Sequence, residues 1–129
     1  MINKRYEKGM EVLREHLGVK ADEYAQSIEK VAPLFAKINV ECAYGDVYGS
    51  ENSVLSAKTK ELCALAALTV RGDSLPQLKL HIDAALRCGA TKEEIVEVIT
   101  LMILYGGFPT ATNAIMVAKE VFEDKGLLT

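Results

Sequence analysis

The sequence predicts an all-α fold, built as a helical bundle, and three observations support this prediction. Apolar residues recur at helical spacing through most of the 129 residues. No segment alternates with the period of two that a half-buried strand would show. Half of the residues are hydrophobic, so one sizeable core can form without disulfides or metal ions. The length predicts a single domain over residues 1–129.

Composition also excludes several classes of function. The 15 basic and 18 acidic residues give a net charge of −3, and no basic stretch carries the interleaved aromatic residues of a nucleic-acid surface. No apolar run reaches the roughly 20 residues of a membrane span, and the N-terminus lacks the apolar core of a signal peptide. We therefore expect a cytoplasmic protein that binds neither nucleic acid nor membrane.

The three cysteines indicate reduced thiols. Cys42, Cys63 and Cys88 are odd in number and widely spaced, unlike a disulfide framework or a zinc site. Each lies among apolar neighbours, and none belongs to a Cys-x-x-Cys motif that would lower the pKa of a thiol. We expect small, buried, apolar side chains and no metal.

The first half of the chain predicts two helices followed by a loop. The first helix covers about 4–17 and ends at Gly18. The second begins near Ala21, is restarted or kinked at Pro33, and continues through Cys42. The stretch 44–52 contains two glycines and several polar turn residues, so it predicts a structured loop. The inward stripe of the first helix is predicted to consist of Tyr6, Met10, Leu13 and Leu17.

The second half predicts four further helices. Ser56 caps a helix whose residues 62–70, LCALAALTV, carry no charge, and a helix that is apolar on all sides is a buried helix. The next helix opens near Pro76 and closes at Gly89. A capping box at 91–94 starts a helix over 95–105. A last helix runs from Pro109 to about Lys125, with Ala114, Val117, Ala118 and Val121 facing inward.

The two apolar helices at 62–70 and 95–105 indicate a homo-oligomer. Both are difficult to bury in a chain of this size, because one of them needs cover on every side. The alternative is that both pack centrally in a monomeric bundle, and composition does not separate the two.

His81 and Glu61 are the candidate catalytic residues. Helical spacing places His81 on one face with four apolar residues, which are Leu78, Ala84, Ala85 and Cys88. Glu61 heads the uncharged run and shares a stripe with Leu65 and Leu68. Each has a structural alternative: His81 as a core histidine bonded to a carbonyl, and Glu61 as a charge favoured by the first turn of its helix. One inward Glu and one inward His on adjacent helices favour an acid–base pair at the wall of a small-molecule pocket.

Other side chains are weaker candidates. Tyr44, Tyr48 and Tyr105 flank the glycine-containing breaks and could line the pocket, as could Cys63, although packing in a core or interface is the other interpretation. His16 lies near a helix end, next to Arg14 and Glu15 in the sequence. We expect it to be solvated or to interact with the C-terminal end of the helix dipole.

An ordered series of motifs resembles the carboxymuconolactone decarboxylase family. The series comprises AYGDVY at 43–48, KEL at 60–62, HIDAAL at 81–86, GATKEEI at 89–95 and YGGFP at 105–109. The match runs from about residue 40 to the end. The resemblance implies an all-helical fold of the alkylhydroperoxidase-D-like type and a ring-like homo-oligomer, commonly a hexamer. It also implies that Glu61 and His81 belong to the active site.

The family contains two chemistries. In the alkylhydroperoxidase branch a Cys-x-x-Cys precedes the histidine, and here Ser74 and Gln77 occupy those positions. The decarboxylase branch uses no cofactor: the substrate carboxylate leaves as carbon dioxide, and its electrons flow through a double bond to the lactone carbonyl. The resemblance thus implies that His81 donates a proton to the carbon beside that carbonyl, while Glu61 orients His81.

The sequence also leaves two alternative functions open, and it differs from the family's usual pattern at one position. A peroxiredoxin-like antioxidant protein could use Cys63 or Cys88 in place of the missing pair. A non-enzymatic oligomeric binding protein would keep Glu61 and His81 as a structural pair. Relatives often carry arginine before the glutamate, whereas this chain has Lys60, which lacks the planar fork that grips a carboxylate.

Overall fold

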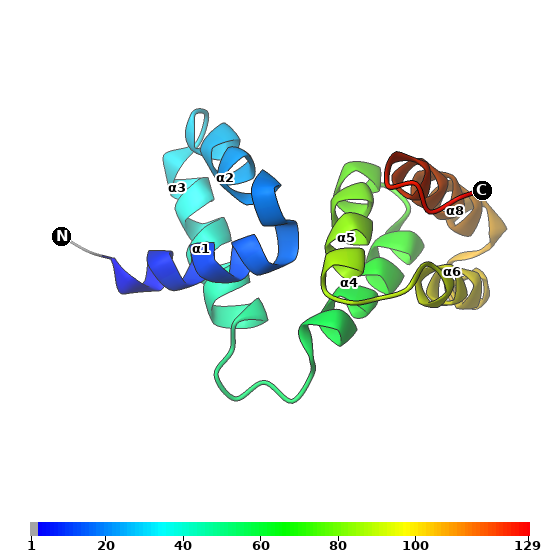
Figure 1. Cartoon of the computed structure of the whole chain (residues 1–129), viewed down its shortest axis with the longest axis horizontal. Coiled ribbons are helices and arrows are strands. Elements are labelled where there is room, and N and C mark those ends of the chain that lie inside the picture. Colours follow the sequence, from blue (N-terminus) through cyan, green and yellow to red (C-terminus); the bar gives the residue numbers. More distant parts are fainter. Residues whose placement is uncertain (1–2) are drawn as a thin grey trace. The chain divides into compact units, whose positions relative to one another are not determined.

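The chain folds into helices that form two compact units (Figure 1). The computed structural model describes residues 3–129 and contains no β-strand in that range. Unit 1 is Met1–Ala57 and unit 2 is Lys58–Thr129. The all-α prediction is confirmed. The extent of a single domain over residues 1–129 stays a prediction.

Unit 1 begins with a helix whose two ends follow from its sequence. Asn3 caps α1 by accepting hydrogen bonds from the backbone N–H groups of Arg5 and Tyr6. Gly18 ends the helix with φ at 62°, a conformation that favours glycine. The elements of unit 1 are α1 (Lys4–Leu17), the 3₁₀ turn η1 (Gly18–Lys20), α2 (Ala21–Glu29), α3 (Pro33–Ile38) and the π-helix η2 (Asn39–Tyr48).

Two glycines let α1 approach η2 closely. A Cβ on Gly9 would lie 2.1 Å from the carbonyl oxygen of Val40, so no other residue fits there. A Cβ on Gly45 would lie 3.5 Å from Cα of Gly9. The two backbones therefore pack against each other through these positions.

The predicted loop at 44–52 is wrong in its first half. The π-helix η2 continues to Tyr48, and the irregular segment begins only at Gly49. Gly45 is buried against α1, so it serves close packing and not a turn. A glycine that permits close approach and a glycine that permits a turn give the same sequence signal.

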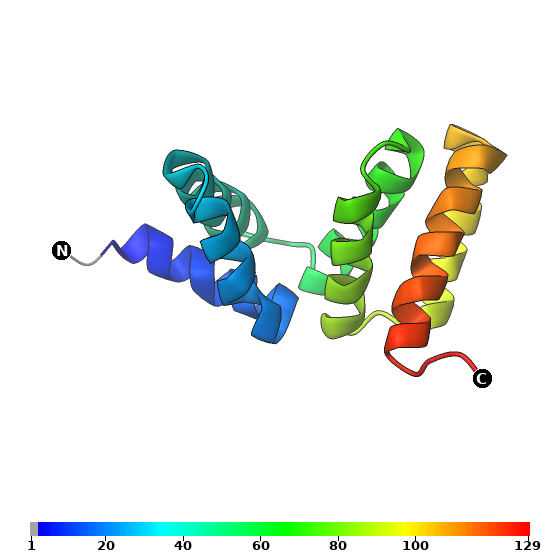
Figure 2. The same ribbon diagram turned by 90° about the horizontal axis from the view of Figure 1, so that it is seen from above.

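Unit 2 is a bundle in which α5, α6 and α8 pack against one another (Figures 1 and 2). Pro76 lies in the first turn of α5, and Gly89 follows that helix with φ at 103°. The core gathers Leu65, Leu78, Ile82, Ile95, Ile99 and Phe122 with small alanines from α5 and α8. The elements of unit 2 are α4 (Ala57–Arg71), α5 (Leu75–Arg87), α6 (Lys92–Leu101), α7 (Ile103–Gly106) and α8 (Phe108–Asp124).

Several predicted details of unit 2 are confirmed. The capping box is present, with Thr91 accepting from the N–H of Glu94 and Glu94 accepting from the N–H of Thr91. Ala114, Ala118 and Val121 are buried on α8, and Val117 is half-buried. The helix expected over 95–105 is interrupted at Met102, which separates α6 from α7.

Within one chain, α4 is not buried on all sides, so the prediction of burial all round does not hold without a second copy. Only the stripe Glu61, Leu65 and Thr69 is fully buried, and Cys63 and Ala67 are exposed. The prediction that all three thiols are buried is wrong as well. Cys42 and Cys63 are exposed, and Cys88 is half-buried. Cys63 lies two positions after Glu61, about 200° around the helix, and therefore on the opposite face of α4. Its apolar neighbours in the sequence do not determine which face of the helix is buried.

No helix in the described range is both long and apolar enough to cross a membrane.

Candidate active site

Helix α4 buries a carboxylate. Glu61 stands one turn before Leu65 and two turns before Thr69, and this spacing puts all three on the inward face of α4. The side chain of Glu61 is 0% exposed. A carboxylate removed from water needs a hydrogen-bond donor, because burial otherwise disfavours its charged form.

Helix α5 supplies that donor. His81 lies between buried residues on both sides along its helix face, with Leu78 one turn before it and Ala84 and Ala85 one turn after it. Its side chain is 14% exposed, so part of the ring faces away from the core. The predicted inward face of α5 is confirmed.

The two side chains meet. Nδ1 of His81 lies 2.7 Å from Oε1 of Glu61, which confirms that they are within hydrogen-bond reach. An ionised Glu61 accepts a hydrogen bond from Nδ1–H, which fixes the ring orientation and its tautomer. Nε2, on the opposite edge of the ring from that bond, can then accept or deliver a proton. The pair has the arrangement of an oriented general acid–base.

A second buried carboxylate anchors the helix that carries His81. Asp83 is buried on α5 and forms an ion pair with Lys125 just beyond α8, and its other oxygen lies 3.6 Å from Arg87. Sequence reasoning missed this residue. The spacing of Asp83 and Arg87, four apart on one helix, is the signal that could have indicated the pair.

The weaker pocket candidates are distributed over both units. In unit 1, Tyr44 is buried and stacks on Tyr48 with ring centroids 5.2 Å apart. In unit 2, Tyr105 is 70% exposed on α7, and Cys63 is exposed on α4. The structure brings together Glu61 and His81 among the predicted residues of unit 2. The pocket-lining role of the others stays a prediction.

His16 corrects one expectation. It is 1% exposed, not solvated, and its ring lies edge-on to Tyr48 with centroids 4.9 Å apart. Its other aromatic neighbour is Tyr44, at 6.3 Å. Arg14 and Glu15 are exposed, and they suggested the wrong side because they lie about 200° and 100° away from His16 around the helix.

Sequence reasoning also missed an ionic cluster around a buried carboxylate in unit 1. The side chain of Glu41 is 3% exposed and accepts hydrogen bonds from Arg5, Lys37 and Asn3, at 3.1 to 3.3 Å. Arg5 also pairs with Asp46, which lowers the pKa of that carboxyl. The i, i+4 spacing of Lys37 and Glu41 could have indicated the cluster.

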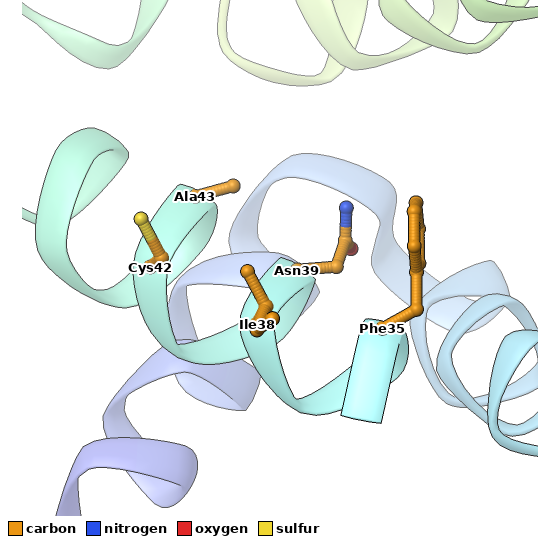
Figure 3. Close-up of a pocket in the computed structure, with 5 residues that line it drawn as sticks. All are labelled: Phe35, Ile38, Asn39, Cys42 and Ala43. Atoms are coloured by element: carbon orange, nitrogen blue, oxygen red, sulfur yellow. The ribbon is translucent and has the colours of Figure 1, made fainter. Parts of the chain in front are cut away.

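A small apolar pocket lies on unit 1. Its volume is about 330 Å³, and Figure 3 shows its lining side chains, which come from α3 and η2. They are Phe35, Ile38, Asn39, Cys42 and Ala43. None of the predicted catalytic residues belongs to it. Across residues 3–129, no group of three or more His, Cys, Asp or Glu side chains could hold a metal ion.

Comparison with known proteins identifies a family and two relatives of the chain. Residues 33–120 match the model of the carboxymuconolactone decarboxylase family. A 4-carboxymuconolactone decarboxylase from Acinetobacter baylyi is 32% identical over 124 residues, which are 95% of this chain and 90% of that protein. An uncharacterised 15.0 kDa protein from the nqo9–nqo10 intergenic region of Paracoccus denitrificans is 34% identical over 112 residues, covering 86% of this chain and 78% of that protein.

Proposed function

The chain belongs to the carboxymuconolactone decarboxylase family, and we propose that it is a lyase that decarboxylates a small carboxylated lactone or a related acid without a cofactor. The observation that carries this proposal is the 2.7 Å contact between Nδ1 of His81 and Oε1 of a fully buried Glu61. An acid–base pair is the machinery that this reaction needs from a protein, because the substrate supplies its own electron sink.

The reaction balances with these two side chains. The bond between the ring carbon and the carboxylate breaks, carbon dioxide leaves, and the electron pair moves through the double bond onto the lactone carbonyl oxygen. The resulting dienolate takes a proton from Nε2 of His81 at the carbon beside the carbonyl. Solvent then returns a proton to His81, and Glu61 stabilises the imidazolium in each cycle.

Burial of Glu61 serves this mechanism. In a low-dielectric environment the attraction between a carboxylate and an imidazolium is stronger than in water. A permanently charged partner would neutralise Glu61 without offering a proton at neutral pH, whereas histidine changes charge in that range. Lys60 precedes Glu61 on α4 and is half-buried, so we assign to it the attraction of the substrate carboxylate.

The proposal is tested with the wild-type protein and 4-carboxymuconolactone in deuterated water. We expect carbon dioxide release without added cofactor, and one deuterium in the product at the carbon beside the carbonyl. Absence of carbon dioxide release from this and related carboxylated lactones would overturn the proposed activity. Release with deuterium elsewhere would overturn the proton transfer.

The peroxidase alternative has less support. Ser74 precedes α5 and Gln77 lies in its first turn, so the positions of the redox branch hold no sulfur. Cys42 and Cys63 are exposed, yet they lie on different units and no disulfide links them. We therefore favour the decarboxylase.

A further inference from the structure

We propose that a pocket on unit 1 binds a small organic cation, which carries a primary ammonium group on a short apolar stem. The pocket has a volume of about 300 Å³. Its lining residues come from α1 and the residue that caps it, the last residue of α2, α3, and η2. All of them belong to unit 1, so the proposal does not depend on the lyase activity assigned to Glu61 and His81 in unit 2.

The ionisable side chains of the pocket carry an excess of negative charge. Glu29 and Glu41 contribute two carboxylates, and Lys37 contributes one ammonium, which pairs with Glu41 at 3.3 Å. Glu29 is exposed and forms no ion pair with any residue of the range 3–129. Arg5 also bonds to Glu41, but its charge is offset by its second partner, Asp46. A singly charged cation would balance the carboxylate that is left over, whereas an anion would be repelled.

Glu41 can accept one more hydrogen bond. An ionised carboxylate can accept about four. Oε1 of Glu41 accepts from Arg5 and Lys37, and Oε2 accepts from the side-chain amide of Asn3 at 3.1 Å. The remaining acceptor position is therefore on Oε2, the oxygen beside Asn3, which also lines the pocket. Because the Glu41 side chain is 3% exposed, a donor on a ligand would satisfy a lone pair that water reaches poorly.

The hydroxyl of Tyr6 is a further acceptor. Tyr6 is half-buried on α1, and its hydroxyl makes no hydrogen bond within the described part of the chain. Burial, and next the negative charge of Glu29, raise the pKa of this hydroxyl, so the two side chains lie close enough to interact. Tyr6, Glu29 and Oε2 of Glu41 together offer three acceptors. A primary ammonium group has three N–H donors.

The remaining lining of the pocket is apolar. Pro33 and the buried Ala36 contribute hydrocarbon side chains, and the ring of Tyr6 adds an aromatic surface. A cation that lies over such a ring gains attraction in addition to its hydrogen bonds. These surfaces suit an apolar stem, while the acceptors orient the ammonium group. The volume limits the ligand to about ten non-hydrogen atoms.

The test is an NMR titration of the full chain with phenethylammonium at constant ionic strength. We expect a Kd of about 1 mM, with chemical-shift changes in the backbone amides of unit 1 around Tyr6 and Lys37. The alcohol 2-phenylethanol has the same stem without the charge and should bind about tenfold more weakly. The N,N,N-trimethyl derivative keeps the charge but has no N–H donors, so it should bind about threefold more weakly.

Glu29→Gln should weaken the binding of phenethylammonium about fivefold, because it removes the carboxylate that has no other partner. Glu29 is exposed at the end of α2, so the fold should persist, with unchanged helicity by circular dichroism. Glu23→Gln is the matched control, since it removes the same charge from an exposed position of the same helix, outside this pocket. It should change the Kd less than about twofold.

If Glu29→Gln loses helicity, Tyr6→Phe takes its place, because it removes only a hydroxyl and should weaken binding about threefold. Three results would overturn the proposal. They are the absence of shifts in unit 1 at probe concentrations well above 1 mM, equally tight binding of either analogue, and wild-type binding by the folded variant. The titration contains no lactone, so neither its success nor its failure bears on the decarboxylase assay.

Discussion

Units 1 and 2 each contain one histidine and one buried glutamate. The two residues contact each other in unit 2, whereas in unit 1 each has other partners. In unit 2, Glu61 bonds to His81. In unit 1, Glu41 is held by Arg5, Lys37 and Asn3, while His16 packs against tyrosine rings. The same two residue types therefore give a structural cluster in one unit and a candidate catalytic pair in the other.

The partner of each carboxylate makes the difference. Arginine and lysine stay charged across the physiological range, so the two cations that bond to Glu41 do not exchange protons at neutral pH. Histidine titrates near neutrality, so a carboxylate beside it can tune and orient a proton donor. Burial alone does not indicate a catalytic glutamate. Burial against a titratable partner makes Glu61 a candidate.

The largest expected effect comes from removing the charge of Glu61. Glu61→Gln keeps the shape of the side chain but no longer stabilises an imidazolium, so decarboxylation turnover should fall on the order of 100-fold. The matched variant Glu41→Gln in unit 1 should keep turnover within about threefold per folded molecule. Equal losses in the two variants would remove the functional distinction between the units.

Unit 1 should respond in stability instead. Glu41→Ala leaves two cations and an amide without their shared acceptor, and we expect a loss of about 2 kcal/mol in the free energy of unfolding. Arg5 and Lys37 are more than half exposed and regain water, so the cost stays below that of breaking a fully buried pair. Urea unfolding measures it, and a change within experimental error would show that the cluster does not stabilise unit 1.

A smaller effect is expected at the start of α6 in unit 2. Thr91→Ala removes the side-chain acceptor of the capping box and should cost about 1 kcal/mol of unfolding free energy. Thermal unfolding with an unchanged midpoint would contradict this.

The same cap has a predictable pH dependence. The backbone N–H of Thr91, and then the ammonium of Lys58, lower the pKa of Glu94. The ionised Glu94 carboxylate therefore stabilises the fold fully at pH values above the ordinary carboxyl pKa, about 4.3. This stabilisation is lost as the pH falls through the lower pKa that Glu94 has in the folded protein. The difference in unfolding midpoint between wild type and Glu94→Gln should be full at neutral pH and vanish in acid. A constant difference across that range would contradict the cap.

The smallest effect on activity is expected from thiol modification. One exposed cysteine in each unit, Cys42 and Cys63, should react quickly with an alkylating reagent in the native protein, and Cys88 more slowly. Decarboxylation should persist in the triple Cys→Ala variant. Peroxide reduction that disappears in parallel with labelling would instead support a redox function.

The helices were predictable from the sequence because their boundaries depend on local chemistry. Gly18, Pro33 and the capping box at 91–94 act within a turn of their own positions. Gly45 led to the wrong prediction of a loop, because this glycine serves a tertiary contact and not a turn. It packs against α1, which is distant in the sequence. The exposure of Cys63 and the burial of His16 depend on which face of a helix packs inward, and one charged or apolar neighbour does not decide that.

The pairing of Glu61 and His81 was predictable for a related reason. Both residues interrupt otherwise apolar faces of neighbouring helices, and a buried carboxylate requires a donor. The Glu41 cluster escaped notice because its partners come from α1 and α3 and look like ordinary surface charges in the sequence. The apolar surroundings made Glu61 and His81 conspicuous in the sequence, whereas Glu41 was indicated only by its i, i+4 spacing from Lys37.

The most direct test compares the two histidines of the chain. Decarboxylation turnover per folded molecule is measured for His81→Asn and for His16→Asn under identical conditions, with helicity as the control for folding. The account predicts a loss on the order of 100-fold or more for His81→Asn and near wild-type turnover for His16→Asn. Wild-type turnover in His81→Asn would contradict the assignment of the Glu61–His81 pair as the catalytic acid and base.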